Sequence, residues 1–431
     1  MSANSVLDLT LREILRVINP LREDWSTRFH IIEELQNVVQ SVESLRGATV
    51  EPYGSFVSNL FTRWGDLYIS IELPNGSYIP SAGRKRKQTL LGDVLKALRR
   101  TGGYRKLQFI ANAKVPILKF ECNHQNISCD ISINNLIGQM KSKLLFWLNE
   151  IDGRFRDMIL LVKEWAKAHN INDSKSGTLN SYSLSLLVIF HFQTCIPAIL
   201  PPLKEIYPRN LVDDLAGVRA DAERLIEETC AVNIGRLRRD RSRTANRSSL
   251  SELFVSFLAK FSNIGLRASV QGICPYTGQW EDISSNMRWL PKTYALFVED
   301  PFEQPQNAAR TVSNRQLVRI ANAFQISHGI LRSANQNQSS LIATLARPQI
   351  SQFIARTSLR SPSYYGRGDL STRPQVQGSP QMQRSTHSPS QVQHQFQNMR
   401  LSGHPNNMAI PRSVQSSHIQ SQQRRRPRSD R

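Results

Sequence analysis

The sequence predicts an α+β fold: a small mixed β-sheet with helices on one side, then a mainly helical domain and a disordered C-terminal tail. Short apolar or alternating runs, which are typical of strands, are concentrated between residues 49 and 133. From Gly138 onward, apolar residues recur at helical spacing instead. After Arg332 the composition changes to Gln, Ser, Pro, Asn and Arg, which cannot bury enough apolar surface to offset chain entropy.

The part of the chain that forms the sheet begins with helices. Pro20 separates two stretches with helical spacing, and the first strand leads into a Gly54-Ser55 turn that is expected to open a short helix. The polar, basic segment 77–88 is expected to be a loop. The predicted helices are 6–18, 24–45 and 89–100, and the predicted strands are 49–53, a strand that carries Asp66, 106–110, 115–121 and 127–133.

The second half is predicted to be helical. Its helices are expected at 141–149, 154–168, 182–194, 213–236, 250–261 and 312–331, with a basic link at 236–247 and an irregular segment at 280–288. The domain boundaries that follow are 1–46 for N-terminal helices, 47–137 for the sheet domain, 138–332 for the helical domain and 333–431 for the tail.

The chain is strongly basic, with a formal net charge of +21. The segment after Arg332 carries 13 Arg and 2 Asp, so about half of the excess lies in the predicted tail. This balance favours nucleic acid as the partner, then an acidic membrane surface, while solvated charge is the alternative. For the terminal cluster 424–428, an RNA-binding tail, a nuclear-import address and a solubilising tail all remain open.

Five scattered Cys without a CxxC pair indicate a reducing compartment and no structural zinc. The N-terminus has no apolar region of a secretory signal, and the most apolar run, 184–200, is too short and too polar to span a bilayer. We therefore expect a soluble protein of the cytoplasm and nucleus, with no membrane partner.

The stretch from Gly54 to Glu72 carries the first candidate chemistry. Strand alternation places Asp66, Tyr68, Ser70 and Glu72 on one face, and Asp130 lies on a separate strand. Carboxylates on neighbouring strands are costly to bring together unless a cation neutralises them, so they indicate a metal site. The Gly54-Ser55 turn offers a hydroxyl and free amides to a triphosphate, although a purely structural turn would also explain it.

Further along, Lys163 and Lys167 share one helix face, and their mutual repulsion would be relieved by a triphosphate. An exposed basic helix face is the alternative. Ser181 and Tyr182 open the next helix and offer a hydroxyl and a ring that could stack on a base. A helix cap and a core tyrosine explain these two residues equally well.

The order of the motifs GS, GD, CDIS, KEWAK and NSYSL resembles that of a known family. Residues 54–302 resemble the noncanonical poly(A) polymerases and terminal uridylyltransferases of the DNA polymerase beta-like nucleotidyltransferase superfamily. SSLSELFVSFLAKFS at 248–262 is similar to the poly(A)-polymerase-associated segment, and EDPFEQPQNAAR at 299–310 to the nucleotide-recognition stretch. Within the family, residues 1–330 are most similar to the plant enzymes that uridylate microRNAs and small interfering RNAs.

The resemblance implies a catalytic palm that lies between N-terminal helices and a helical, poly(A)-polymerase-associated domain. The N-terminal helices would pack on that helical domain. The resemblance also implies that Asp66 and Asp130 bind Mg²⁺ or Mn²⁺, and that Tyr182 stacks on the uracil of UTP. Asn135 would contact the ribose, while Asp300, Asn307 and Arg310 would border the base. The remaining nucleotide-binding positions that it implies are Gly54, Ser55, Ser142, Lys163, Lys167 and Ser181.

Three residues depart from the family pattern. Tyr68 stands where a carboxylate normally bridges both metals, and a phenol with an ordinary pKa of about 10 is neutral at pH 7. Glu72 is on the same face but about 13 Å further along the strand, so it cannot replace that carboxylate. Gln306 and Lys141 stand where some uridylyl-specific relatives have His and Asn.

The resemblance implies an RNA 3′-terminal uridylyltransferase that adds untemplated uridines to small RNAs, including RNAs bound to Argonaute, and promotes their degradation. Two alternatives stay open. Tyr68 is consistent with a catalytically impaired RNA-binding relative of the same fold, and adenylyl transfer would differ only in the nucleotide. The sequence makes no prediction about the oligomeric state.

Overall fold

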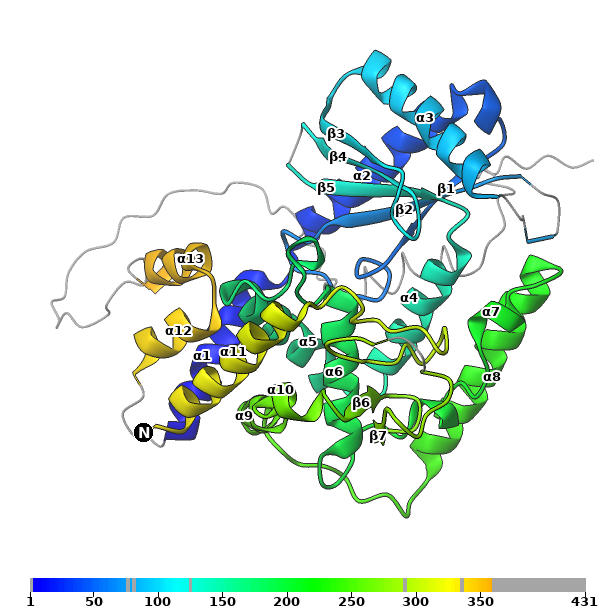
Figure 1. Cartoon of the computed structure of the whole chain (residues 1–431). Coiled ribbons are helices and arrows are strands. Elements are labelled where there is room, and N and C mark those ends of the chain that lie inside the picture. Colours follow the sequence, from blue (N-terminus) through cyan, green and yellow to red (C-terminus); the bar gives the residue numbers. More distant parts are fainter. Residues whose placement is uncertain are drawn as a thin grey trace, which may run out of the picture. The chain divides into compact units, whose positions relative to one another are not determined.

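The computed structural model of the protein describes residues 3–74, 78–79, 83–123, 126–289, 293–333 and 337–358. The strands are β1 Thr49–Tyr53, β2 Leu67–Glu72, β3 Tyr104–Ile110, β4 Ile117–Cys122, β5 Ser128–Ile133, β6 Gln271–Cys274 and β7 Gln279–Asp282. The α-helices are α1 Ala3–Ile18, α2 Arg22–Gln40, α3 Arg84–Thr101, α4 Leu136–Asn149, α5 Arg154–Ala168, α6 Ser181–Thr194, α7 Leu211–Asp214, α8 Arg219–Arg239, α9 Leu250–Phe261, α10 Ile264–Arg267, α11 Asn314–Arg332, α12 Gln338–Leu345 and α13 Pro348–Ser358 (Figure 1).

A mixed sheet of five strands, in the order β1-β2-β5-β4-β3, forms the first layer. β2 and β5 are parallel, and the other neighbours are antiparallel. Helices α2 and α3 pack on one face, where Leu35 and Val94 meet Leu67, Ile69 and Ile131 in one apolar core. The opposite face carries the polar residues of β2 and β5, which leaves it available for a site.

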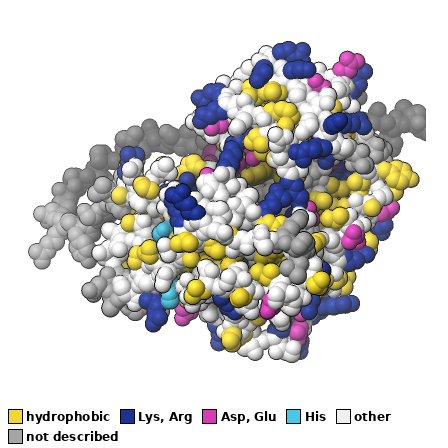
Figure 2. Space-filling model, in the orientation of Figure 1, with side chains coloured by type: hydrophobic (Ala, Val, Ile, Leu, Met, Phe, Trp, Pro, Cys, Tyr) yellow, Lys and Arg dark blue, Asp and Glu magenta, His cyan; other side chains and the backbone are white. Residues whose placement is uncertain are grey.

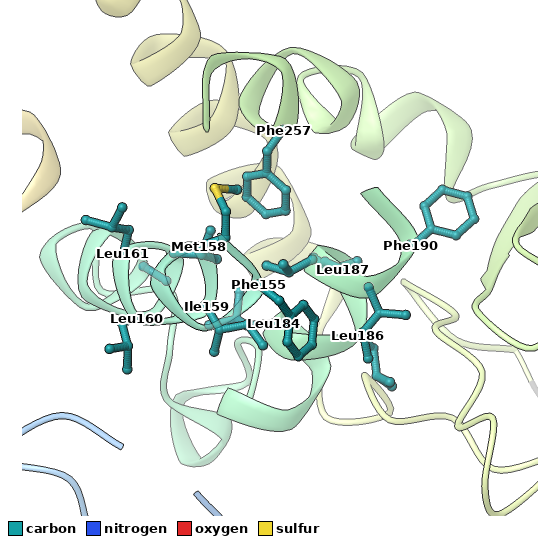
Figure 3. Packing of buried hydrophobic residues seen from close by; sticks show 14 of the residues in the cluster. Phe155, Met158, Ile159, Leu160, Leu161, Leu184, Leu186, Leu187, Phe190 and Phe257 are labelled. Carbon is teal, nitrogen blue, oxygen red and sulfur yellow. The ribbon is translucent and has the colours of Figure 1, made fainter. Parts of the chain in front are cut away.

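The helices that follow β5 share a second apolar core. Neighbouring side chains of α5 and α6 fill it, and Phe257 of α9 reaches Met158 of α5 (Figure 3). α6 is apolar on nearly every side, which is typical of a helix surrounded by others. In the part of the chain that the structure describes, no helix is long and apolar enough to cross a membrane.

The two N-terminal helices belong to different cores, which corrects the prediction that both pack on the helical domain. Leu11 and Ile14 of α1 do lie in the helical core. By contrast, Ile31 and Leu35 of α2 lie in the sheet core. The short connection from α2 to β1 keeps this helix beside the sheet.

The tail was predicted to begin at residue 333, which is too early in the chain, because α12 and α13 lie after that position. Their apolar residues Leu341, Leu345, Ile350 and Ile354 are buried in the helical core. Many polar residues lie between these apolar ones, so the composition of the segment did not indicate helices. The rest of the predicted tail, residues 359–431, lies outside the described residues.

Three local predictions also need correction. The segment after Gly54 forms turns rather than a helix, because Gly54 and Asn59 both adopt positive φ, at 74° and 58°. α3 begins at Arg84, so the basic run expected in a loop is helical. The segment 280–288, expected to be irregular, begins within β7 of the hairpin β6–β7, whose strands of four residues each are too short to show a pattern.

Candidate active site

Asp66 and Asp130 come together on the polar face of the sheet. Asp66 directly precedes β2, and Asp130 lies on the parallel neighbour β5. The turn before Asp66 is held by the buried Arg28 of α2, whose Nη2 donates to the carbonyl oxygens of Arg63 and Gly65 at 3.0 and 2.7 Å. This guanidinium fixes the point at which β2 begins, and it therefore also fixes the position of the Asp66 carboxylate.

Lys119 of β4 lies between the two carboxylates. Its Nζ is 3.7 Å from Asp66 Oδ2 and 3.4 Å from Asp130 Oδ1. Burial raises the pKa of Asp130, Lys119 lowers it, and Asp66 raises it further. The ammonium therefore offsets part of the repulsion between the carboxylates.

Tyr68 lies directly opposite Asp130 in the parallel register of β2 and β5. Its ring packs against the Gly54 turn, where a Cβ would lie 3.2 Å from Tyr68 Cδ2, and its centroid is 5.6 Å from that of Tyr53. Burial and the neighbouring Asp66 carboxylate raise the pKa of Tyr68, so this side chain is a neutral phenol at physiological pH.

The donor set fits one divalent cation better than a pair. Asp130 Oδ1 is buried and accepts no hydrogen bond from the described residues, and the Lys119 ammonium at 3.4 Å is in the place where a bound cation would neutralise it. However, those residues contain no group of three or more His, Cys, Asp or Glu side chains that could hold a metal ion. Glu72 does not supply the third carboxylate, because it is bound by Ser70, Gln139 and Arg219.

The Gly54 turn is tied to the helical domain by two side chains. The Gly54 amide donates to Ser142 Oγ of α4 at 2.6 Å. The prediction that this amide is free to bind a triphosphate is therefore wrong. Lys163 Nζ of α5 donates to the carbonyl oxygen of Leu60 at 2.9 Å. Ser55, between these anchors, is partly exposed. The turn is thus held from both of its ends.

Lys163 and Lys167 sit one turn apart on α5, as their spacing requires. Burial, with a smaller effect of Lys167, lowers the pKa of Lys163 to about 7. Burial and Arg347 lower the pKa of Lys167, which is partly exposed. Because its pKa is close to neutral, Lys163 gains charge when an anion arrives.

A second cluster surrounds Tyr182 at the start of α6. Tyr182 Oη donates to Asp300 Oδ1 at 2.9 Å, and Lys141 Nζ lies 5.2 Å from the centroid of the Tyr182 ring. Lys141 pairs with Asp300 and with Glu303, the latter at 2.8 Å. Lys114, which precedes β4, pairs with the other Glu303 oxygen at 2.7 Å. The Lys114 pair joins the sheet domain to the 299–310 stretch, and the Lys141 pairs join α4 to the same stretch.

Other candidate residues have structural partners. Asn135 caps α4 by accepting from the Gly138 amide, and the buried Asn307 binds three backbone groups of its own loop. Ser181 follows the true cap of α6, which is Asn180. Arg310 is exposed. The nucleotide-binding roles of these residues remain predictions.

Sequence reasoning missed Lys119, although a signal was present. In the run Leu118-Lys119-Phe120, alternation places the lysine on the face opposite the two apolar side chains, and that face is the one with Asp130. The pairing of Lys114 and Lys141 with Glu303 had no comparable signal, because these residues are far apart in sequence.

A mixed sheet with two carboxylates beside a Gly-Ser turn, facing a helical domain with lysines and an aromatic ring, defines a nucleotidyltransferase. A family model described as the central palm domain of mitochondrial-like poly(A) RNA polymerase matches residues 7–148. Protein HESO1 of Arabidopsis thaliana is 61% identical over 368 residues, which cover 85% of this chain and 72% of that protein. The chain therefore belongs to the noncanonical poly(A) polymerase and terminal uridylyltransferase family, whose members are nucleotidyltransferases that act on RNA.

More distant relatives share the fold. Poly(A) RNA polymerase GLD2 of Mus musculus is 31% identical over 217 residues, which cover 50% of this chain and 42% of that protein. A solved cytoplasmic RNA terminal U-transferase matches with a TM-score of 0.60 and 22% identity, covering 79% of this chain and 99% of the other. The mtPAP complex with UTP matches with a TM-score of 0.60 and 20% identity, covering 82% and 72%. These matches confirm the predicted palm and helical domain.

Proposed function

We propose that this protein is an RNA 3′-terminal uridylyltransferase that adds uridines from UTP to small RNAs, free or bound to Argonaute, and so promotes their degradation. One observation carries the proposal. The consecutive residues Lys141 and Ser142 of α4 join the Gly54 turn to the cluster of Asp300 and Tyr182. A triphosphate on the turn and a base on the ring would therefore be held by one rigid helix.

Lys141 favours a uracil base in this arrangement. An ammonium group has three donors, and two of them serve Asp300 and Glu303. The third can donate to a carbonyl oxygen of uracil, whereas the amino group of adenine offers it no acceptor. The 61% identity to HESO1, over 85% of the chain, supports terminal nucleotidyl transfer, the activity on which this base preference would act.

The chain's own side chains account for substrate positioning. Asp66 and Asp130 would hold Mg²⁺ or Mn²⁺, which supplies activation of the RNA 3′-hydroxyl and charge neutralisation of the triphosphate. Ser55 and Lys167 would bind phosphate oxygens. Ser55 lies in the Gly54 turn and Lys167 lies on α5, and both side chains are partly exposed. Figure 2 shows Lys and Arg side chains on the sheet domain and along the hollow below it, which suits an RNA backbone.

Tyr68 favours a second candidate function. A neutral ring in register with Asp130 leaves the site one negative charge short of a site for two cations. The protein would then bind the RNA end and the nucleotide without efficient transfer.

The deciding assay combines the purified full chain with a labelled small RNA, Mg²⁺ or Mn²⁺, and each nucleoside triphosphate in turn. Extension with UTP supports uridylyl transfer. Extension with ATP in preference to UTP would assign adenylyl transfer instead, and tight RNA binding without extension would favour the second candidate function.

We expect Lys141→Met to reduce the preference for UTP over ATP by about tenfold. The loss of one charge-assisted hydrogen bond costs about 1.5–3 kcal/mol, and about 1.4 kcal/mol corresponds to a factor of ten. Equilibrium binding of UTP and ATP measures the change without depending on catalysis. Lys143→Met is the matched control, because this lysine of the same helix also forms an ion pair, with Glu223 at 3.0 Å. An unchanged preference in Lys141→Met would show that this lysine does not select the base.

A further inference from the structure

The C-terminal helices α12 and α13 pack directly against elements of the candidate active site. α12 and α13 contact α1, and α12 also contacts α5, the helix with Lys163 and Lys167 (Figure 1). Just beyond α5, His169 Nε2 is 3.0 Å from the carbonyl oxygen of Thr344. The segment 337–358 is therefore fixed to the helix that carries the lysines.

Arg347, between α12 and α13, forms a buried ion pair with Glu164 of α5. Its Nε donates to Oε1 at 3.0 Å, its Nη2 donates to Oε2 at 2.8 Å, and its backbone amide donates to Oε1 at 3.0 Å. The Glu164 side chain is 0% exposed. A carboxylate buried to this extent needs a cation, and Arg347 supplies one with bidentate geometry.

The position of Glu164 gives this pair its significance. Glu164 directly follows Lys163, and Lys167 is three residues further on, which is a contact spacing on a helix. Burial lowers the pKa of Lys167 most, Arg347 lowers it further, and Asp66 and Glu164 raise it, so the arginine opposes the effect of the Glu164 carboxylate on this lysine. Without Arg347, Lys167 would be a cation within helical contact spacing of the unpaired Glu164 carboxylate.

The same segment reaches the start of the catalytic strand. The Phe353 ring of α13 lies 6.1 Å from the Trp64 ring, measured between centroids. Trp64 is two residues before Asp66, in the turn whose carbonyl oxygens Arg28 holds. One short segment thus contacts both the triphosphate side and the carboxylate side of the site.

We propose that Arg347 is a positioning residue for the triphosphate: by holding Glu164, it leaves Lys167 free to bind phosphate oxygens. The inference rests on the proposed function, because it assumes that Lys163 and Lys167 bind the triphosphate of UTP. It assigns a role in nucleotide binding to a segment that looks, in the sequence, like the start of a tail.

The test compares UTP affinity in full-length variants. We expect Arg347→Gln to weaken UTP binding by about tenfold, because Lys167 turns toward the unpaired carboxylate. Glu164→Gln should bind UTP as well as the unmodified protein. The double variant Glu164→Gln/Arg347→Gln should recover UTP affinity to within about threefold, since no unpaired carboxylate remains. Arg356→Gln, an exposed change on α13, is the matched charge control.

Thermal unfolding separates positioning from folding. If Arg347 only stabilised the fold, both the single variant and the double variant would unfold at a lower temperature and both would bind UTP less tightly. That result would overturn the proposal. Recovery of affinity in a double variant that is still less stable would support it. If Lys167→Met left UTP binding by the unmodified protein unchanged, the proposed triphosphate site itself would be wrong. If Lys167→Met weakened binding but Arg347→Gln did not, only the role of Arg347 would fail.

Discussion

Tyr68→Asp is expected to raise the rate of RNA tailing by about 100-fold or more. The change adds a carboxylate opposite Asp130 in the register of β2 and β5, next to the cation that Asp66 and Asp130 would hold. Charge stabilisation by a bound cation is worth several kcal/mol in the transition state, and about 1.4 kcal/mol is a factor of ten in rate. Single-turnover extension of a labelled RNA with UTP measures the effect.

Tyr68→Asn is the matched control for this gain. Asparagine removes the same ring from the Gly54 turn and has nearly the shape of aspartate, but it brings no charge. A similar gain in both variants would mean that the ring obstructs the substrate, so that charge is not the cause. Equal tailing by the unmodified protein and Tyr68→Asp would show that Tyr68 does not impair catalysis.

Lys163→Met is expected to weaken UTP binding by about 10- to 100-fold. It removes a cation that a triphosphate would charge fully, together with the hydrogen bond to Leu60 that holds the Gly54 turn. Lys260→Met is the control, because Lys260 also donates to a backbone carbonyl, that of Thr194. Thr194 ends α6, about 18 Å along the helix from Tyr182. Equal losses of affinity in both variants would exclude a specific role for Lys163.

The pH dependence has a defined sign. Since the pKa of Lys163 is lowered to about 7, its ammonium is present below that pH and lost above it. UTP affinity should therefore fall as the pH rises from about 7 to about 8.5, and Lys163→Met should flatten that decline. Between about pH 7 and the ordinary lysine pKa of about 10.4, the unfolded chain binds more protons than the folded one. Hence the contribution of Lys163 to the free energy of unfolding rises with pH in this range, which denaturant titrations can follow.

Local patterns were sufficient to predict much of the sheet domain. Alternation correctly placed Tyr68 and Glu72 on one face of β2, because that face is set by strand geometry and by the apolar side chains of Leu67 and Ile69 on the other face. Helices α5 and α9 have the predicted bounds, since each has a sustained apolar stripe.

Long-range contacts were not predictable in the same way. Nothing near Glu164 in the sequence indicates that its partner is Arg347, 183 residues away. Composition also led to the wrong prediction that 338–358 is disordered. Apolar residues such as Leu341 and Ile350 are few in this segment, but neighbours from other helices bury them. Pairing across a fold depends on tertiary packing, which a local pattern does not contain.

The unbroken register around Tyr68 has a genetic consequence. β2 and β5 pair without irregularity on both sides of this residue, and Asp66, Asp130 and Lys119 keep their places around it. Codons for tyrosine and aspartate differ only in their first base. A single base change in the gene would therefore convert a site with two carboxylates into one with three, and the rest of the fold is already in place to receive it.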